Sequence, residues 1–104
     1  MSKKFRVEIT ASAERDVRSI RDIIARDKPR AADKWVREIT RRIRSLKSMP
    51  LRHEVIPEAE ELSVDYRHII FGNYRALYRV EGDRVLILRV IHAARLLDQS
   101  MLHA

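Results

Sequence analysis

The chain has 104 residues, 45% of them hydrophobic and 36% charged, which is typical of one soluble globular domain and too apolar for a disordered tail. It contains no cysteine, which excludes disulfides, thiol nucleophiles and cysteine-based zinc sites. The net charge of +7 is concentrated in residues 1–50, with 15 Lys and Arg against 7 Asp and Glu, whereas residues 51–65 carry one against five. A basic body with one acidic loop indicates an anionic partner, either nucleic acid or an acidic protein.

The sequence has no feature of a secreted or membrane protein. It begins with a charged alternating segment and not with a signal peptide. No apolar run approaches the roughly 20 residues that a membrane span requires. We therefore expect a cytoplasmic protein without a membrane partner, and a single domain over residues 1–104.

The first half of the chain predicts a strand followed by a helix. Phe5, Val7 and Ile9 alternate with polar residues, as in a half-buried strand. Apolar residues then recur at every third or fourth position to about Asp27, which indicates one face of a helix. Ser12 is the expected N-cap of this helix.

A second helix is expected to begin at Pro29, because proline suits the first turn of a helix and not its interior. The helix should end near Pro50, and its apolar face consists of Ala32, Trp35, Val36, Ile39, Ile43 and Leu46. Since the connection is so short, the two helices should form an antiparallel hairpin.

Residues 66–92 predict three strands joined by two tight turns. The turns are Gly72-Asn73 and Gly82-Asp83, which suit two-residue hairpin loops. Residues 50–65 indicate a loop with a short helical turn. The segment after His92, residues 93–98, is either a last short helix or a loose end, and the tail at 97–104 could be loose. The element order is therefore β-α-α-β-β-β. This is an α+β fold in which an antiparallel helical hairpin packs on a mostly antiparallel sheet of about four strands.

Two-residue turns also predict the register of the sheet. The expected pairs are Val80 with Val85, Leu77 with Leu88, and Arg75 with both Val90 and Ile70. This register places His68, Arg75, Arg79 and His92 on one face, where imidazole and guanidinium groups could bind phosphate and transfer protons. A slip of one residue in a turn would move half of them to the other face.

Each of these side chains also has an ordinary structural explanation. His68 could be a histidine at a sheet edge, Arg75 could pair with an acid of residues 58–65, and His92 could merely end a strand. The glutamates at 58, 60 and 61 indicate a solvated acidic loop. The sequence has no Gly-rich phosphate loop and no two histidines at metal-ligand spacing, so we expect neither a metal nor a cofactor.

The second predicted helix carries a basic stripe opposite its apolar face. The stripe repeats at spacings of four and three residues and consists of Arg30, Lys34, Arg37, Arg41 and Arg44. Few acids accompany it, so we expect that pairing within the helix does not neutralise it. It is either a solvated helix face or a surface for phosphates or an acidic protein, and phosphate binding would depend steeply on salt.

The order and spacing of these elements resemble the RelE/ParE superfamily of toxins from bacterial type II toxin–antitoxin modules. The similar segments are residues 5–17, 31–46, 72–80 and 85–95. The resemblance implies a small toxin that forms a hetero-oligomer with a cognate antitoxin, whose C-terminal segment wraps the toxin as a helix and a strand. We expect that segment to be acidic, and we expect DNA contact only through the antitoxin complex.

Two activities exist in this superfamily. RelE-type members cut mRNA in the ribosomal A site, for which Arg75, His92, His68 and Arg89 would be the candidate catalytic residues here. ParE-type members lack that catalytic set and poison DNA gyrase. In the stretch Ile91-His92-Ala93-Ala94-Arg95-Leu96-Leu97, alanines replace the arginines that follow the histidine in RelE-like ribonucleases, and a leucine replaces their tyrosine. The sequence therefore favours a ParE-like, plasmid-stabilisation-type gyrase poison. A ribosome-dependent mRNA endonuclease and an inactive antitoxin-binding member are the alternatives.

Basic side chains are the expected contacts with the antitoxin or the target. They are Arg30, Lys34, Arg37, Arg41, Arg44, Arg75, Arg79 and Arg95. Apolar anchors between such cations would provide affinity, and the charges would provide association rate and specificity.

Overall fold

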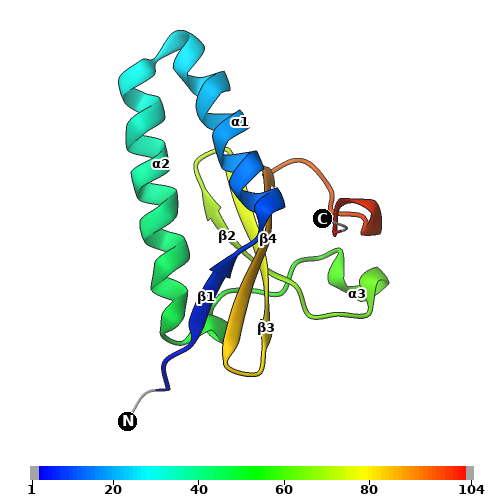
Figure 1. The fold of residues 1–104 in the computed structure, drawn as a ribbon. Coiled ribbons are helices and arrows are strands. Elements are labelled where there is room, and N and C mark those ends of the chain that lie inside the picture. The colour runs from blue at the N-terminus through cyan, green and yellow to red at the C-terminus, as the bar shows by residue number, and fades with distance from the viewer. Residues whose placement is uncertain (1–2, 103–104) are drawn as a thin grey trace.

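The computed structural model describes residues 3–102, which form a helical hairpin packed on one face of a four-stranded sheet (Figure 1). The main elements are β1 (Arg6–Ile9), α1 (Ala11–Asp27), α2 (Pro29–Arg44), α3 (Ala59–Leu62), β2 (Arg67–Phe71), β3 (Tyr74–Glu81) and β4 (Arg84–His92). Three short 3₁₀ helices are η1 (Ser45–Lys47), η2 (Pro50–Arg52) and η3 (Gln99–Leu102). The α+β class and the element order expected from the sequence are confirmed.

The strands lie in the order β1-β4-β3-β2. β1 runs parallel to β4, and the other two pairs are antiparallel, so the sheet is mixed and mostly antiparallel as expected. Because the first strand pairs with the last, the helical hairpin must cross over the sheet between them. β4 is therefore an inner strand, hydrogen-bonded on both sides.

The first helix begins two positions earlier than an N-cap at Ser12 would allow, so the expected N-cap was wrong. Thr10 has extended backbone angles and its hydroxyl accepts the amide proton of Ala13 at 3.2 Å, as an N-cap does. The same hydroxyl donates to the Leu88 carbonyl of β4 at 3.1 Å. Ser12 lies inside the helix, where its hydroxyl accepts from Arg15.

Apolar side chains of both helices pack on one face of the sheet and form the main core. Trp35 of α2 meets the edge of the Tyr74 ring on β3, with ring centroids 5.5 Å apart. Tyr78, at the centre of the same strand, is fully buried, and its hydroxyl donates to the Pro50 carbonyl. The buried members of this cluster are Ala13, Ile20, Trp35, Ile39, Ile43, Leu46, Ile69, Ala76, Tyr78, Val85, Ile87 and Val90.

The register of the sheet is only partly as predicted. The expected pairing of Val80 with Val85 is confirmed, and so is that of Arg75 with Ile70. Gly72 and Gly82 adopt φ of 59° and 60°, the left-handed conformation that these tight turns require.

Further along the last hairpin, a β-bulge makes the remaining register prediction wrong. Leu77 faces Arg89 and the next residue of β3 faces Ile87, so Leu88 is one extra residue in β4. The bulge moves every later residue of β4 by one position. Arg75 therefore faces Ile91, and His92 faces Tyr74 on the helix-covered side of the sheet.

The opposite face of the sheet is covered by residues 54–66 and by the C-terminal segment, which lie together on that side in Figure 1. The buried cluster there consists of Ile56, Ala59, Tyr66, Leu77, Ile91, Leu97 and Met101. The short helix expected over residues 93–98 is not found, because these residues form a turn and an irregular segment and η3 begins only at Gln99. The tail at 97–102 is nevertheless packed and not loose, since Leu97 and Met101 are buried. Residues 103–104 of the predicted tail lie outside the described residues. None of the helices between residues 3 and 102 has the length and apolar character of a membrane span.

The Tyr78 hydroxyl provides a test of this packing. Tyr78→Phe leaves the buried Pro50 carbonyl without its donor, so we expect the free energy of unfolding to fall by about 1–2 kcal/mol. Tyr74→Phe is the matched control, because its contacts with Trp35 and His92 are made by the ring. Denaturant unfolding measures both, and equal losses would contradict a contribution from the Tyr78–Pro50 hydrogen bond.

Candidate functional site

Two of the predicted site residues, Arg75 and His68, lie together in the interior on the face opposite the helices. Arg75 is only 3% exposed. Its Nη1 donates to Nδ1 of His68 at 3.2 Å. Because a guanidinium can only donate, Nδ1 accepts, and the His68 proton is on Nε2, which lies 2.9 Å from Oε1 of Glu54. The imidazole is therefore held between an arginine and a glutamate.

The charge of Arg75 is compensated by Glu58, which precedes α3. The guanidinium donates to both carboxylate oxygens, and its Nη2 also donates to the Arg95 carbonyl. The second oxygen of Glu58 accepts the amide proton of Leu97 at 2.8 Å. We call these four residues, Glu58, Arg75, Arg95 and Leu97, the C-terminal latch, because they attach the C-terminal segment to the sheet.

The Glu58 carboxylate is ionised in this setting. Burial by itself raises its pKa, but the hydrogen bonds from Arg75 and from the Leu97 amide outweigh burial and lower the pKa to about 2. The possibility that Arg75 pairs with an acid of residues 58–65 is thus confirmed. The prediction of a solvated acidic loop was wrong for Glu58, whose side chain is 11% exposed, because the sequence did not show that the loop folds over Arg75.

A second ion pair, between half-buried side chains, joins Arg89 of β4 to Asp16 of α1. The Arg89 guanidinium donates to both oxygens of Asp16 on α1, at 2.7 and 2.9 Å, and its Nη1 donates to the Met101 carbonyl at 2.9 Å. The hydrogen bond to Asp16 raises the pKa of Arg89. Asp16 also accepts the Val90 amide proton beside the bulge, at 2.9 Å. The sequence carried no signal for this role, since Asp16 looks like an ordinary polar position of an amphipathic helix.

His92 lies apart from the other candidate catalytic residues. It is exposed at the end of β4, its ring stands 5.6 Å from that of Tyr74, and its Nδ1 accepts the Ala94 amide proton at 3.1 Å. The structure therefore brings together only two of the four candidates, His68 and Arg75. Arg89 is bound to α1, and His92 is on the other face of the sheet.

Arg79 stays on the face predicted for it, but it is not a free cation. It is half-buried and forms an ion pair with Glu81 at 3.0 Å. Its Nε is buried and has no hydrogen-bond partner within residues 3–102. Arg95 contributes its backbone carbonyl to the C-terminal latch, while its side chain is exposed.

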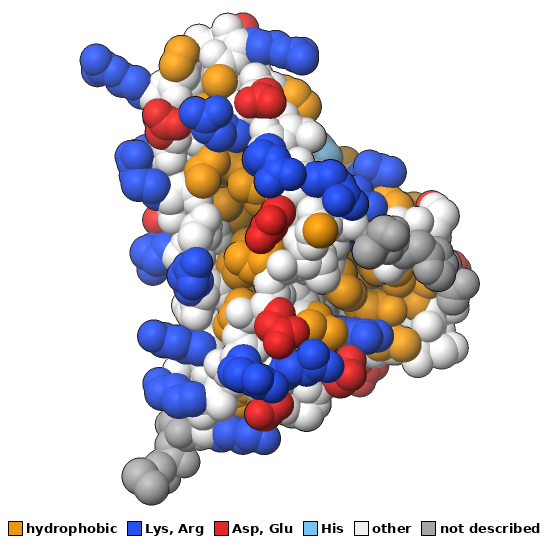
Figure 2. All heavy atoms as spheres, in the orientation of Figure 1, with side chains coloured by type: hydrophobic (Ala, Val, Ile, Leu, Met, Phe, Trp, Pro, Cys, Tyr) orange, Lys and Arg blue, Asp and Glu red, His pale blue; other side chains and the backbone are white. Residues whose placement is uncertain are grey.

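The basic stripe is exposed along the outer side of α2. Figure 2 shows Lys and Arg side chains in a column at the left edge of the molecule, where α2 lies in Figure 1. The sequence predicted that ion pairs within the helix would not neutralise the stripe. This is wrong at Arg41, because Glu38 of the same helix binds both Arg41 and Arg42. These hydrogen bonds lower the pKa of Glu38 and raise that of Arg41. The stripe residues without an ion pair to any described residue are Arg30, Lys34, Arg37 and Arg44.

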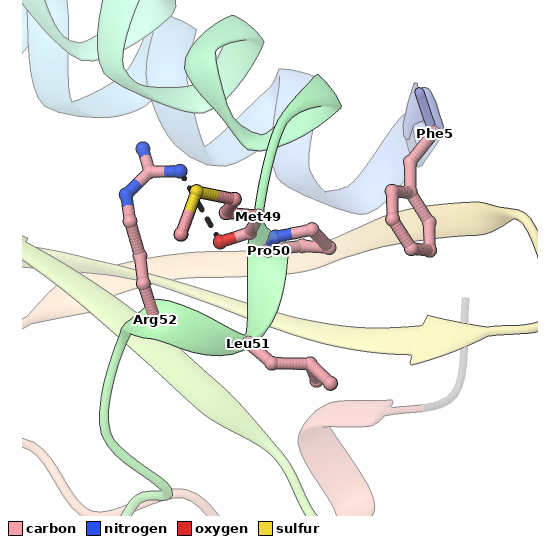
Figure 3. A pocket seen from close by; sticks show the side chains of 5 residues that line it. All are labelled: Phe5, Met49, Pro50, Leu51 and Arg52. Atoms are coloured by element: carbon pink, nitrogen blue, oxygen red, sulfur yellow. Dashed lines mark hydrogen bonds between the residues drawn. The ribbon is translucent and has the colours of Figure 1, made fainter. Parts of the chain in front are cut away.

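An apolar hollow that the sequence did not reveal lies at the base of the helical hairpin (Figure 3). Its volume is about 390 Å³, and its lining residues are Phe5, Met49, Pro50, Leu51 and Arg52. In Figure 3 the Pro50 ring and the Leu51 side chain point toward the side where Phe5 lies, while Arg52 extends the other way and donates to the Met49 carbonyl. The amide of Phe5 donates to the Lys47 carbonyl, which brings these distant segments together.

A second hollow shares Phe5 with the first. It measures about 250 Å³ and is lined by Phe5, Val7, Arg44 and Lys47. The two hollows together offer an apolar surface with cations at its border. Among the residues that the structure describes, no three His, Asp or Glu side chains are placed to share a metal ion.

The C-terminal latch predicts a stability change that depends on pH. Glu58→Gln removes one charge of a buried pair, so we expect the free energy of unfolding to fall by about 3 kcal/mol at neutral pH. The pKa of Glu58 is about 2 in the fold and 4.5 ordinarily, so the ionised form stabilises the fold above pH 4.5 and this contribution is lost as pH falls toward 2.

Denaturant unfolding at several pH values measures this difference between wild type and Glu58→Gln. Glu61→Gln, an exposed position on α3, the short helix that follows Glu58, is the matched control and should change little. A gap between wild type and Glu58→Gln that stays constant down to pH 2 would contradict the latch.

The sequence and the fold of this chain were compared with those of known proteins. The family model described as the ParE toxin of the type II toxin–antitoxin system parDE matches residues 7–97. The structure of a chromosomal ParDE system from P. aeruginosa is similar with a TM-score of 0.70 and 21% identity, over 88% of this chain and 98% of that one. The toxin–antitoxin complex RelBE2 from Mycobacterium tuberculosis is similar with a TM-score of 0.59 and 26% identity, over 86% and 98%. No curated protein sequence matches the chain. Since the family model covers nearly the whole chain, the protein belongs to the ParE toxin family of type II toxin–antitoxin systems.

Proposed function

We propose that this toxin acts by poisoning DNA gyrase and not by cutting mRNA. One observation supports this proposal: two of the candidate catalytic residues, Arg75 and Arg89, form ion pairs that hold the fold together. Arg75 is bound by Glu58 in the interior, and Arg89 is bound by Asp16. His92 lies on the opposite face from Arg75.

Cleavage of RNA without a metal requires three groups at one place. A base must activate the ribose 2′-hydroxyl, a cation must stabilise the phosphorane, and an acid must protonate the leaving oxygen. Such groups must reach a bound phosphate. A guanidinium that is 3% exposed and already donates to a carboxylate, an imidazole and a carbonyl cannot do so without dismantling the C-terminal latch.

We propose that the partner which neutralises the toxin is an antitoxin with an acidic amphipathic segment. The two structural neighbours described above belong to toxin–antitoxin systems, and one of them is a toxin–antitoxin complex. The first hollow beside Phe5 is apolar and has Arg52 in its lining, and Arg44 and Lys47 line the second hollow, which shares Phe5. An apolar anchor followed by acidic residues fits this combination, because burial of the anchor gives affinity and the charges select the partner.

Gyrase poisoning is tested with purified components. Relaxed plasmid, gyrase and ATP are combined with increasing toxin, and we expect supercoiling to be inhibited and the inhibition to be relieved by the antitoxin. Supercoiling that is unchanged at high toxin excess would contradict the proposal.

The ribonuclease alternative is tested in parallel by mapping mRNA ends on translating ribosomes. His92→Ala is suitable here because His92 is exposed, so the substitution should leave the fold intact. We expect no A-site cleavage by either protein and equal gyrase inhibition by both. Cleavage by the wild type that His92→Ala abolishes would establish the ribonuclease instead.

The antitoxin site is tested by placing a charge in the apolar hollow. Leu51 is 59% exposed, and Leu51→Asp should weaken antitoxin binding at least about tenfold, because a buried leucine contributes roughly 1.5–3 kcal/mol. Ile23→Asp on α1 is the matched control, since Ile23 is 51% exposed and does not line the hollow. Titration calorimetry measures both affinities, and equal losses would place the antitoxin elsewhere.

A further inference from the structure

The basic stripe of α2 is nearly straight. Its members are four and three residues apart, so at 3.6 residues per turn they lie within an arc of about 80° on the helix. From Arg30 to Arg44 the stripe extends for roughly 21 Å, at 1.5 Å per residue. The result is a row of long cationic side chains parallel to the helix axis, all of them exposed (Figure 2).

The acidic residues of α2 are placed at the two sides of this row. Asp33 is engaged by Arg21 of α1 at 3.2 Å, and Glu38 is engaged by Arg41 and Arg42. Neither acid is therefore free to neutralise Arg30, Lys34, Arg37 or Arg44. On the sheet, by contrast, Arg75, Arg79, Arg84 and Arg89 are all ion-paired.

The row also lacks the anchors that a protein partner needs. Arginine is common in protein interfaces, but it contributes most where it packs among buried apolar or aromatic side chains at the centre of the contact. The large hydrophobic side chains that are exposed in the described part of the chain are Ile23, Met49, Leu51, Val55, Val64, Ile70 and Leu96. None of these residues belongs to α2, so the outer face of the helix offers charge and little apolar surface.

From these observations we infer that the outer face of α2 binds the phosphate backbone of duplex nucleic acid, through Arg30, Lys34, Arg37 and Arg44. A duplex carries one negative charge per about 1.7 Å of its axis, so the length of the row spans about a dozen phosphates. Phosphate contacts of this kind need cations and not apolar anchors. The toxin would then touch nucleic acid directly, whereas the sequence led us to expect DNA contact only through the antitoxin complex.

The test measures binding of the isolated full-length toxin to a fluorescent 30-base-pair duplex of arbitrary sequence, by anisotropy at several salt concentrations. Four contacts predict a slope of log K against log salt of about −3.6 for DNA. The triple variant Arg30→Gln, Lys34→Gln and Arg37→Gln should reduce the slope to about −1. DNA and RNA duplexes are compared, and the tighter-bound one identifies the natural source of the phosphates.

The matched control is the triple variant Arg15→Gln, Arg18→Gln and Arg26→Gln, which removes the same charge from exposed positions of α1. Its slope should change by less than about one unit, and thermal unfolding should show both variants folded. Equal loss of binding in the two variants would overturn the inference, since net charge alone would explain it. The inference would also be overturned if the triple variant of α2 lost affinity for the antitoxin but bound the duplex as tightly as the wild type. Because no gyrase is present, failure of the gyrase proposal would leave this result untouched.

Discussion

The structure depends on one buried ion pair, between Arg75 in the middle of the sheet and Glu58 in the loop that covers it. Either charge alone would be costly in the interior, whereas together they stabilise each other and lower the pKa of the carboxyl group. The same two side chains bind the backbone of Arg95 and Leu97. The sheet face opposite the helices is thereby closed by the C-terminal segment, and the hydrogen bonds of Arg75 are used to hold that segment in place.

A second constraint is the extra residue in β4. Leu88 has no opposite residue on β3, and the polar groups around it are satisfied from the start of α1, where Thr10 binds the Leu88 carbonyl and Asp16 binds the Val90 amide. Because the side chains of a strand alternate, this insertion turns His92 away from Arg75. One irregularity in one strand therefore separates the residues that could have formed an acid–base site.

The charges of the molecule fall into two classes with different roles. Four arginines of the sheet, Arg75, Arg79, Arg84 and Arg89, are compensated by acids. Arg89 also holds α1 against the sheet through Asp16. The cations on the outer side of α2 and around the hollow beside Phe5 are exposed. The excess positive charge is thus directed outward, where it can meet an acidic antitoxin at one surface and phosphates at another.

The amino-acid sequence alone determined the element order, the helical hairpin, the turns at Gly72 and Gly82 and the basic stripe, because helix periodicity and turn chemistry act between near neighbours in the chain. It also determined the pairing next to each turn, such as Val80 with Val85. Only the tertiary structure decided the bulge at Leu88, the partner of Arg75, the choice of Thr10 as N-cap and the hollow beside Phe5. Each of these features depends on contacts between segments that are far apart in the sequence. Local patterns allow several arrangements there, and the choice among them is made by loop conformation and by the need of buried backbone groups for hydrogen-bond partners.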